Sequence, residues 1–184
     1  FLLVIDLKTL MFLEKMTTAP KKKHFRYFES YIPKFMKQYF DENGLTLNAK
    51  KQLNSALCFV SKNIANKAKT LTSNVNKKTI SHEDVLTASE LTLSDELFVK
   101  VMQRNTEAIT QFISNSDTKK GESRQAKAGL VLPPSIAEKF LRDFNRSNLL
   151  LTSSAPITLC VVLETVLTDL LTNASTIAKK NKKV

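Results

Sequence analysis

The sequence predicts an all-α fold, on three observations. Apolar residues recur every three or four positions, which is the period of one face of a helix. One such stretch, from Asn48 to about Asn76, contains neither glycine nor proline. A short helix, a loop, a long helix and a basic segment follow one another in this order twice along the chain.

The first half begins with a short helix over Ser30–Phe40, with Pro33 in its first turn, where a missing N–H costs little. The segment 41–44 ends this helix, and the long helix over 48–76 follows. At 1.5 Å per residue its length is about 43 Å. It cannot bury its apolar side alone, so it needs a partner of similar length.

A connector at 77–80 leads to a third helix, from Ser81 to about Leu93. Ser81 and Asp84 have the spacing of a capping box. A fourth helix begins at 94–96 with a cap and two acids and runs to about Phe112. Residues 115–127 hold no large apolar side chain, which predicts a linker.

The second half repeats the order. A short helix starts at 133–135, a loop covers 145–154, and a second long helix starts near Ala155 and ends in the basic run 179–183. Two long helices with matching apolar sides can cross and bury each other. A generic helical bundle would give the same periodicity.

The charge balance favours a polyanionic partner. Lys and Arg number 28 against 17 acids, a net charge of +11. Nucleic acid is the first expectation and an anionic membrane surface the second. A solvated basic surface without a partner is the alternative.

Several chemistries are excluded by composition. The three glycines lie far apart, so no phosphate-binding glycine loop and no nucleophile elbow can form. Cys58 and Cys160 sit in apolar helical runs and are expected to be buried thiols. His24 and His82 lack further ligands at metal spacing. We expect no metal, no cofactor and no enzymatic activity.

The first fifteen residues, Phe1–Lys15, are apolar but carry four charges. The segment is too short and too charged for a membrane span, and it lacks the features of a signal peptide. We expect that Met16 is the initiator or that the segment is an amphipathic extension. An intracellular protein, or one packaged in a particle, is the resulting expectation.

The local sequence resembles core histones in two places. Residues from Tyr31 to Phe112 resemble histone 2B, with KQ at 37–38, the loop at Gly44, KKTIS at 77–81 and DEL at 95–97. The stretch from Ala128 resembles histone 2A, with AGL at 128–130, Pro133, APITLCVVLE at 155–164 and AKKNKK at 178–183. The two in series cover nearly all of 28–183 and are similar to the histone doublets of giant viruses, the marseillevirus group in particular. A complete histone 2A continues into a third helix, for which this sequence has no counterpart.

The resemblance implies a domain organisation. Residues 1–27 would be a leader and basic tail, 28–114 a histone 2B-like unit, 115–127 a linker, and 128–184 a histone 2A-like unit without its third helix. The two units would pair in an intramolecular handshake. The protein would package double-stranded DNA with a histone 3–4 partner, in the nucleus or, if viral, in the virion and the viral DNA compartment of the host cell. No membrane partner is expected.

The resemblance also implies DNA-facing residues at loops and helix N-termini, where N–H groups and cations bind phosphate. They are Lys34, Thr46, Lys77, Lys78, Thr79, Ser135, Arg146, Lys182 and Lys183. Lysines near helix ends can instead be solvated cations that stabilise the helix dipole. A histone-fold transcription-factor subunit with sequence-selective binding is the rival interpretation.

Histone 2A–2B pairs carry an acidic patch that grips arginine anchors of chromatin proteins. By resemblance, Glu96, Glu164 and Asp169 keep acids at patch positions. Arg104 and Thr172 stand where the family has glutamates. We expect Arg104 to lie near Glu164 or Asp169 and to weaken the binding of arginine anchors.

Overall fold

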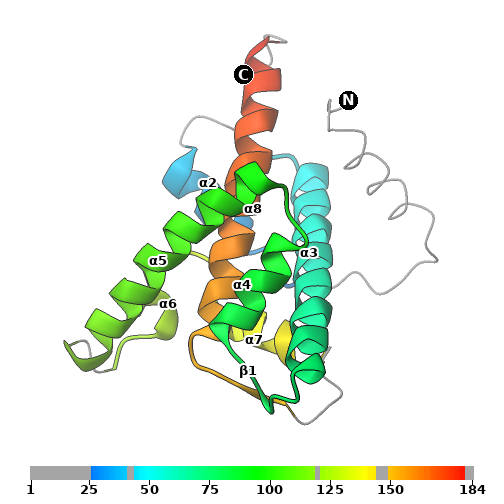
Figure 1. Cartoon of the computed structure of the whole chain (residues 1–184). Helices are drawn as coiled ribbons and strands as arrows, with labels where there is room; N and C mark the ends of the chain where they lie inside the picture. The colour runs from blue at the N-terminus through cyan, green and yellow to red at the C-terminus, as the bar shows by residue number, and fades with distance from the viewer. Residues whose placement is uncertain (1–25, 41–43, 119–120, 144–148, 181–184) are drawn as a thin grey trace.

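The computed structural model describes residues 26–40, 44–118, 121–143 and 149–180, and the regular structure in this part of the chain is helical apart from two short strands (Figure 1). The all-α prediction is therefore confirmed. The elements, in chain order, are α2 (Ile32–Tyr39), α3 (Leu47–Asn74), β1 (Thr79–Ile80), α4 (His82–Glu90), α5 (Asp95–Thr118), α6 (Arg124–Lys127), α7 (Pro134–Asp143), β2 (Leu150–Leu151) and α8 (Ala155–Lys180).

The ends of the long helix α3 are set by local side-chain chemistry. The Thr46 hydroxyl caps its first turn by accepting the Ala49 N–H at 3.2 Å. Beyond its last residue, Asn76 adopts a left-handed backbone with φ of 54°, which turns the chain toward β1. The observed helix thus starts and ends within two residues of the predicted one.

The predicted capping box before α4 is confirmed. The Ser81 hydroxyl accepts the Asp84 N–H at 3.3 Å, and the Asp84 carboxylate accepts the Ser81 N–H at 2.8 Å. Burial alone would raise the pKa of Asp84, but these hydrogen bonds and the nearby Lys77 lower it below its ordinary value.

The predicted linker at 115–127 contains helical residues that its lack of large apolar side chains had not indicated. Helix α5 continues to Thr118, and α6 occupies Arg124–Lys127. Polar side chains hold the segment through backbone groups. The Asn115 amide donates to the Lys127 carbonyl at 3.0 Å, and the Gln125 amide donates to the Val131 carbonyl at 2.7 Å. A segment without large apolar residues is fixed here by hydrogen bonds, which apolar periodicity does not detect.

The core lies where the two long helices meet. Every residue of α8 from Ala155 to Leu167 is buried, because α3, α4, α5 and α7 all pack against this helix (Figure 1). The prediction that each long helix needs a long partner is confirmed for α3 and α8. By length and hydropathy α8 could also cross a membrane, but 78% of its apolar window is buried inside the fold.

A two-residue parallel ladder joins the halves of the chain. Strand β1 pairs with β2 in the register Thr79 with Leu150 and Ile80 with Leu151. The connector after α3 therefore lies beside the loop that precedes α8 (Figure 1).

Both cysteines are buried, as predicted. Burial raises the pKa of the Cys58 thiol to about 11 and that of Cys160 well above its ordinary value. Neither thiol is poised to ionise near neutral pH.

Candidate nucleic-acid interface

The β1–β2 ladder presents one group of predicted DNA-facing residues. The Lys78 carbonyl accepts the Leu150 N–H at 2.8 Å, which fixes the connector backbone against the second loop. Lys77 and Lys78 are exposed beside this ladder, and Thr79 is half-buried within it. Arg146, which the resemblance also assigned to the DNA-facing residues, lies outside the described residues.

Lys77 has a structural contact as well. Its Nζ lies 3.4 Å from the Asp84 carboxylate, and its side chain is 51% exposed. Because the lysine side of this pair is half exposed to solvent, the ammonium group can still reach a phosphate. Lys78 has no ion pair within the part of the chain that the structure describes.

A second group lies around the short helix α2 and the start of α3. Lys34 is exposed in the first turn of α2, with its Nζ 5.5 Å from the centroid of the Tyr31 ring. Thr46 is exposed, and its hydroxyl caps α3. Lys182 and Lys183, which were also predicted to face DNA, are outside the described residues.

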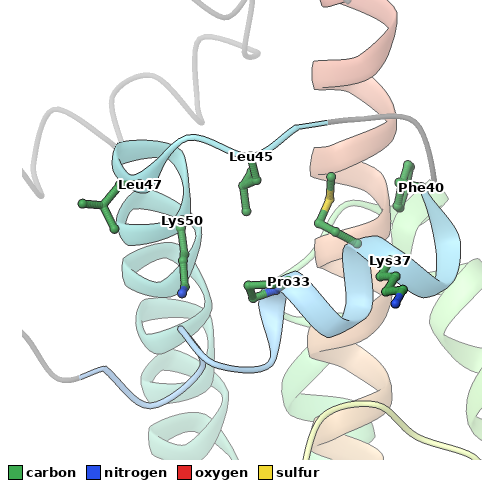
Figure 2. Close-up of a pocket in the computed structure, with 7 residues that line it drawn as sticks. Pro33, Lys37, Phe40, Leu45, Leu47 and Lys50 are labelled. Atoms are coloured by element: carbon green, nitrogen blue, oxygen red, sulfur yellow. The ribbon is translucent and has the colours of Figure 1, made fainter.

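Two lysines that sequence reasoning had not selected lie near this group. A groove of about 470 Å³ separates α2 from the first turns of α3, and Lys37 and Lys50 line it (Figure 2). Pro33, Met36, Phe40, Leu45 and Leu47 form its apolar walls.

Ser135 is exposed at the second position of α7, as an N-terminal anion site would require. Farther along α7, Glu138 binds Arg124 of α6 and Arg142 of its own helix, and these hydrogen bonds lower its pKa.

The chain is strongly polarised in charge, which sequence reasoning could have found but did not use. Residues 44–80 contain seven lysines and no acid, whereas residues 81–118 contain seven acids and only two basic residues. The lysine-rich part forms α3 and β1, and the acidic part forms α4 and α5. A polyanion is therefore attracted to the α3–β1 side of the molecule.

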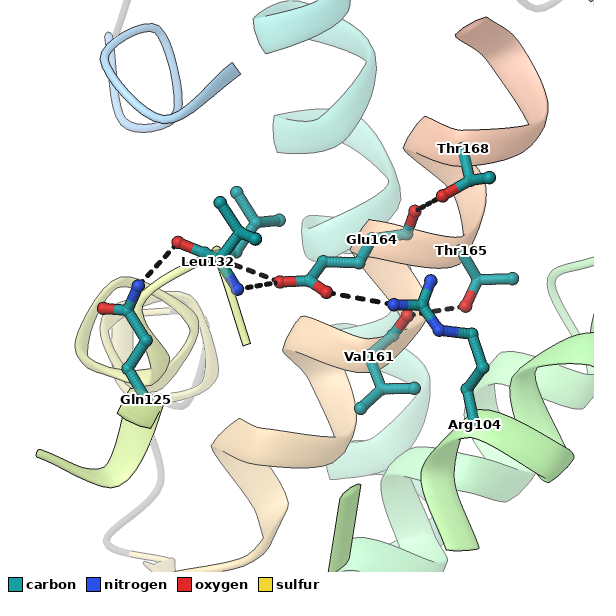
Figure 3. A network of polar contacts seen from close by, with 8 residues as sticks. Arg104, Gln125, Leu132, Val161, Glu164, Thr165 and Thr168 are labelled. Atoms are coloured by element: carbon teal, nitrogen blue, oxygen red, sulfur yellow. Dashed lines mark hydrogen bonds and ion pairs between the residues drawn. The ribbon is translucent and has the colours of Figure 1, made fainter. Parts of the chain in front are cut away.

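The predicted acidic patch is only partly exposed. The prediction that Glu164 belongs to this surface patch is wrong. Its side chain is fully buried (Figure 3). Its Oε1 accepts the N–H groups of Val131 at 2.6 Å and Leu132 at 2.8 Å, and its Oε2 lies 3.2 Å from Nη2 of Arg104. Because both oxygens are engaged inside the fold, Glu164 cannot present a carboxylate to a partner.

The expectation that Arg104 lies near Glu164 is confirmed. Burial raises the pKa of Glu164, and the hydrogen bonds from Leu132, Val131 and Arg104 oppose that rise. The result is a buried polar cluster that joins α5, α8 and the segment at 131–132.

Glu96 and Asp169 are the two predicted patch acids that reach the surface. Glu96 is exposed in the first turn of α5. The Asp169 side chain is 38% exposed, and it binds Lys100 at 3.3 Å and the Asn173 amide at 3.2 Å. A groove of about 310 Å³ beside it is lined by Lys100, Gln103, Arg104, Glu107, Thr165, Thr168, Asp169 and Thr172. Lys100 therefore neutralises an acid that the resemblance had left free.

Residues 30–88 match the model of the family described as histone-like transcription factor (CBF/NF-Y) and archaeal histone. The match spans α2, α3, β1 and most of α4. The description of that family agrees with the resemblance to histones seen in the sequence of this part of the chain.

Proposed function

We propose that this protein is a DNA-packaging histone doublet. Residues 28–114 would act as a histone 2B-like unit and residues 128–184 as a histone 2A-like unit that serves as its partner. The observation that carries the proposal is the β1–β2 ladder. It joins the connector of the matched histone-fold domain to the loop before the second long helix, as the handshake expected from the resemblance requires.

The exposed lysines support binding to DNA of any sequence. Lys77 and Lys78 lie exposed beside the ladder, and Lys34 and Ser135 are exposed in the first turns of α2 and α7. Cations and helix N-termini bind phosphate oxygens, which are the same at every base pair. Such contacts hold and bend duplex DNA through its backbone.

The proposal includes a partner and a location. A histone 3–4 pair or doublet would complete the particle, in the nucleus or, for a viral chain, in the virion and the viral DNA compartment. The protein would act by binding alone, without catalysis and without a cofactor.

A second candidate is a histone-fold transcription-factor subunit, because the matched family includes such factors. It would require preference for particular DNA sequences. The polarised charge of residues 44–80 supports binding to DNA of any sequence and therefore favours packaging.

The test is nuclease digestion of DNA reconstituted with this chain and a histone 3–4 pair. Packaging predicts a protected fragment of fixed length on several unrelated DNA sequences. Lys77→Ala with Lys78→Ala should weaken binding to all sequences alike. A matched control, Lys100→Ala with Lys127→Ala, removes the same charge from the α5–α6 side and should change binding much less. Protection confined to one sequence would support the transcription-factor interpretation instead.

A further inference from the structure

Helix α5 has apolar residues on two sides, and only one side belongs to the core. Val101 and Ala108 face inward and are buried. A second set of residues follows at alternating spacings of three and four, which places them along one side of the helix. This set, which we call the outer stripe, consists of Val99, Met102, Thr106, Ile109 and Ile113.

The outer stripe is open to solvent over most of its length. The exposed fractions of Val99, Met102 and Ile113 are 66%, 41% and 63%. Thr106 is exposed between them, and Ile109 is half-buried against the core. At 1.5 Å per residue the stripe is about 21 Å long. Large apolar side chains gathered on a surface in this way are typical of a contact site for a partner.

The neighbours of α5 lie on its other sides. The helix packs against α8 and also contacts α4 and α6 (Figure 1). Its two cations, Lys100 and Arg104, point toward α8, where they bind Asp169 and Glu164. Because successive residues of a helix are about 100° apart, the outer stripe lies on the flank opposite to these cations. The stripe is therefore separate from the groove beside Asp169.

The acids of α5 lie close to the stripe, unlike its cations. Asp95, Glu96 and Glu107 are exposed, and they form no ion pair within the part of the chain that the structure describes. Asp95 is one turn before Val99 on the line of the stripe, and Glu96 and Glu107 border the Val99 side of it. The surroundings of the stripe are therefore acidic, whereas the α3–β1 side of the molecule is basic.

We propose that the outer stripe is a docking site for a basic amphipathic helix of a protein partner. Apolar residues at spacings of three and four are the anchors with which one helix packs on another. Lysine or arginine beside the anchors of the partner would meet Asp95, Glu96 and Glu107. A second copy of this chain fits less well, because it would bring the same acids to the contact. Docking here does not depend on the proposed DNA binding, since the acids around the stripe repel DNA.

The experiment measures, by fluorescence anisotropy, the binding of a labelled peptide to the full chain. The probe has about 15 residues, which is the length of the stripe, with leucine at alternating spacings of three and four and lysine elsewhere. A control peptide has the same composition with its leucines spread around the helix, so that it has no apolar face. We expect the probe to bind and the control peptide to bind much more weakly.

Two matched variants test the apolar anchors. The stripe variant is Val99→Gln, Met102→Gln and Ile113→Gln. It should lower the affinity for the probe by at least about tenfold, because three apolar side chains no longer contribute to burial at the contact. The control variant replaces three exposed apolar residues in other parts of the molecule and should leave the affinity unchanged; it is Leu47→Gln, Val75→Gln and Leu150→Gln.

The bordering charge is tested separately. Glu96→Gln with Glu107→Gln should weaken binding of the probe by a smaller factor, and this factor should decrease as salt is added. The matched control is Glu83→Gln with Glu90→Gln, which removes two exposed acids from α4 and should change the affinity less.

Circular dichroism and thermal melting should show that all variants fold, and leucine at the three substituted stripe positions should preserve binding. A stripe variant that binds the probe as tightly as the unmodified chain would overturn the docking site. Loss of binding in Asp169→Asn, with full binding in the stripe variant, would place the probe in the groove beside Asp169 and would also overturn it. If the probe does not bind and sedimentation shows a dimer that the stripe variant loses, the occupant is a second copy and the proposed partner is wrong.

Discussion

Glu164 and Asp169 lie on the same helix, and their carboxylates have very different surroundings. Glu164 is fully buried, and it binds two backbone N–H groups and Arg104. Asp169 lies at the surface and binds Lys100 and Asn173. The segment at 131–132 makes the difference, because it covers α8 at Glu164 and leaves Asp169 open. A carboxylate inside the fold can organise three segments, whereas one in water gains little from its ion pair.

The largest expected effect comes from removing the buried carboxylate. Glu164→Ala leaves the N–H groups of Val131 and Leu132 without an acceptor in the core, and it creates a cavity. We expect a loss of about 3 to 5 kcal/mol in the free energy of unfolding, measured by urea denaturation. Glu164→Gln should lose less, because its amide oxygen can still accept these N–H groups. Asp169→Ala should lose under about 1 kcal/mol. Equal losses at the two positions would show that burial does not separate them.

A smaller effect, with a distinctive pH dependence, is expected for Arg104→Ala. Burial already raises the pKa of Glu164, so the folded state binds more protons than the unfolded state above the ordinary glutamate pKa. The stability that this group contributes is therefore lost as pH rises from the ordinary glutamate pKa to the raised pKa of Glu164 in the folded state. Without Arg104 the folded-state pKa rises further, and the pH range over which stability is lost becomes wider.

We expect Arg104→Ala to cost about 2 kcal/mol near pH 7.5 and clearly less near pH 4.5, by urea denaturation at both values. In a Glu164→Gln background the loss in the free energy of unfolding caused by Arg104→Ala should be the same at both pH values. If the loss still differs between them, a group other than Glu164 causes the pH dependence.

The next test concerns the surface carboxylate of Asp169, and it measures the binding of peptides instead of stability. Arginine-anchored peptides that grip cellular histones should bind this protein weakly, because Glu164 is buried and Lys100 occupies Asp169. Thr172→Glu with Lys100→Gln should raise peptide affinity up to about tenfold, by isothermal titration, as it adds one acid and frees another. Arg104 is kept, since an acid there would face Glu164. Affinity of the unmodified protein equal to that of cellular particles would contradict this prediction.

The smallest effect is expected for removal of Lys77, whose half-exposed side chain pairs with the buried Asp84. Lys77→Ala should lower stability by less than about 1 kcal/mol in thermal melts, because the lysine is half exposed. Asp84→Asn should cost more, since Asp84 also closes the capping box with Ser81. A large loss for Lys77→Ala would show that its effect on DNA binding cannot be separated from folding.

The features that could be predicted from the sequence are those set by residues close together along the chain. Helix α3, the capping box at Ser81 and the burial of both cysteines follow from periodicity or from spacings of three and four residues. The helical residues at 115–118 and 124–127 and the burial of Glu164 could not be predicted in this way. They depend on hydrogen bonds from side chains to backbone groups distant in sequence, such as Asn115 to Lys127 and Glu164 to Val131. The run of apolar residues before Glu164 was the one local sign of its burial.

Because the β1–β2 ladder joins two parts of one chain, pairing of the two halves should not depend on protein concentration. Thr79 and Leu150 belong to one chain, so they meet by closing a loop instead of by a collision between two molecules. The entropic cost of closing a loop grows only slowly with its length. The folded fraction of a two-chain pair falls on dilution, whereas that of a single chain does not. The two halves described here therefore stay paired at concentrations where separate subunits would dissociate.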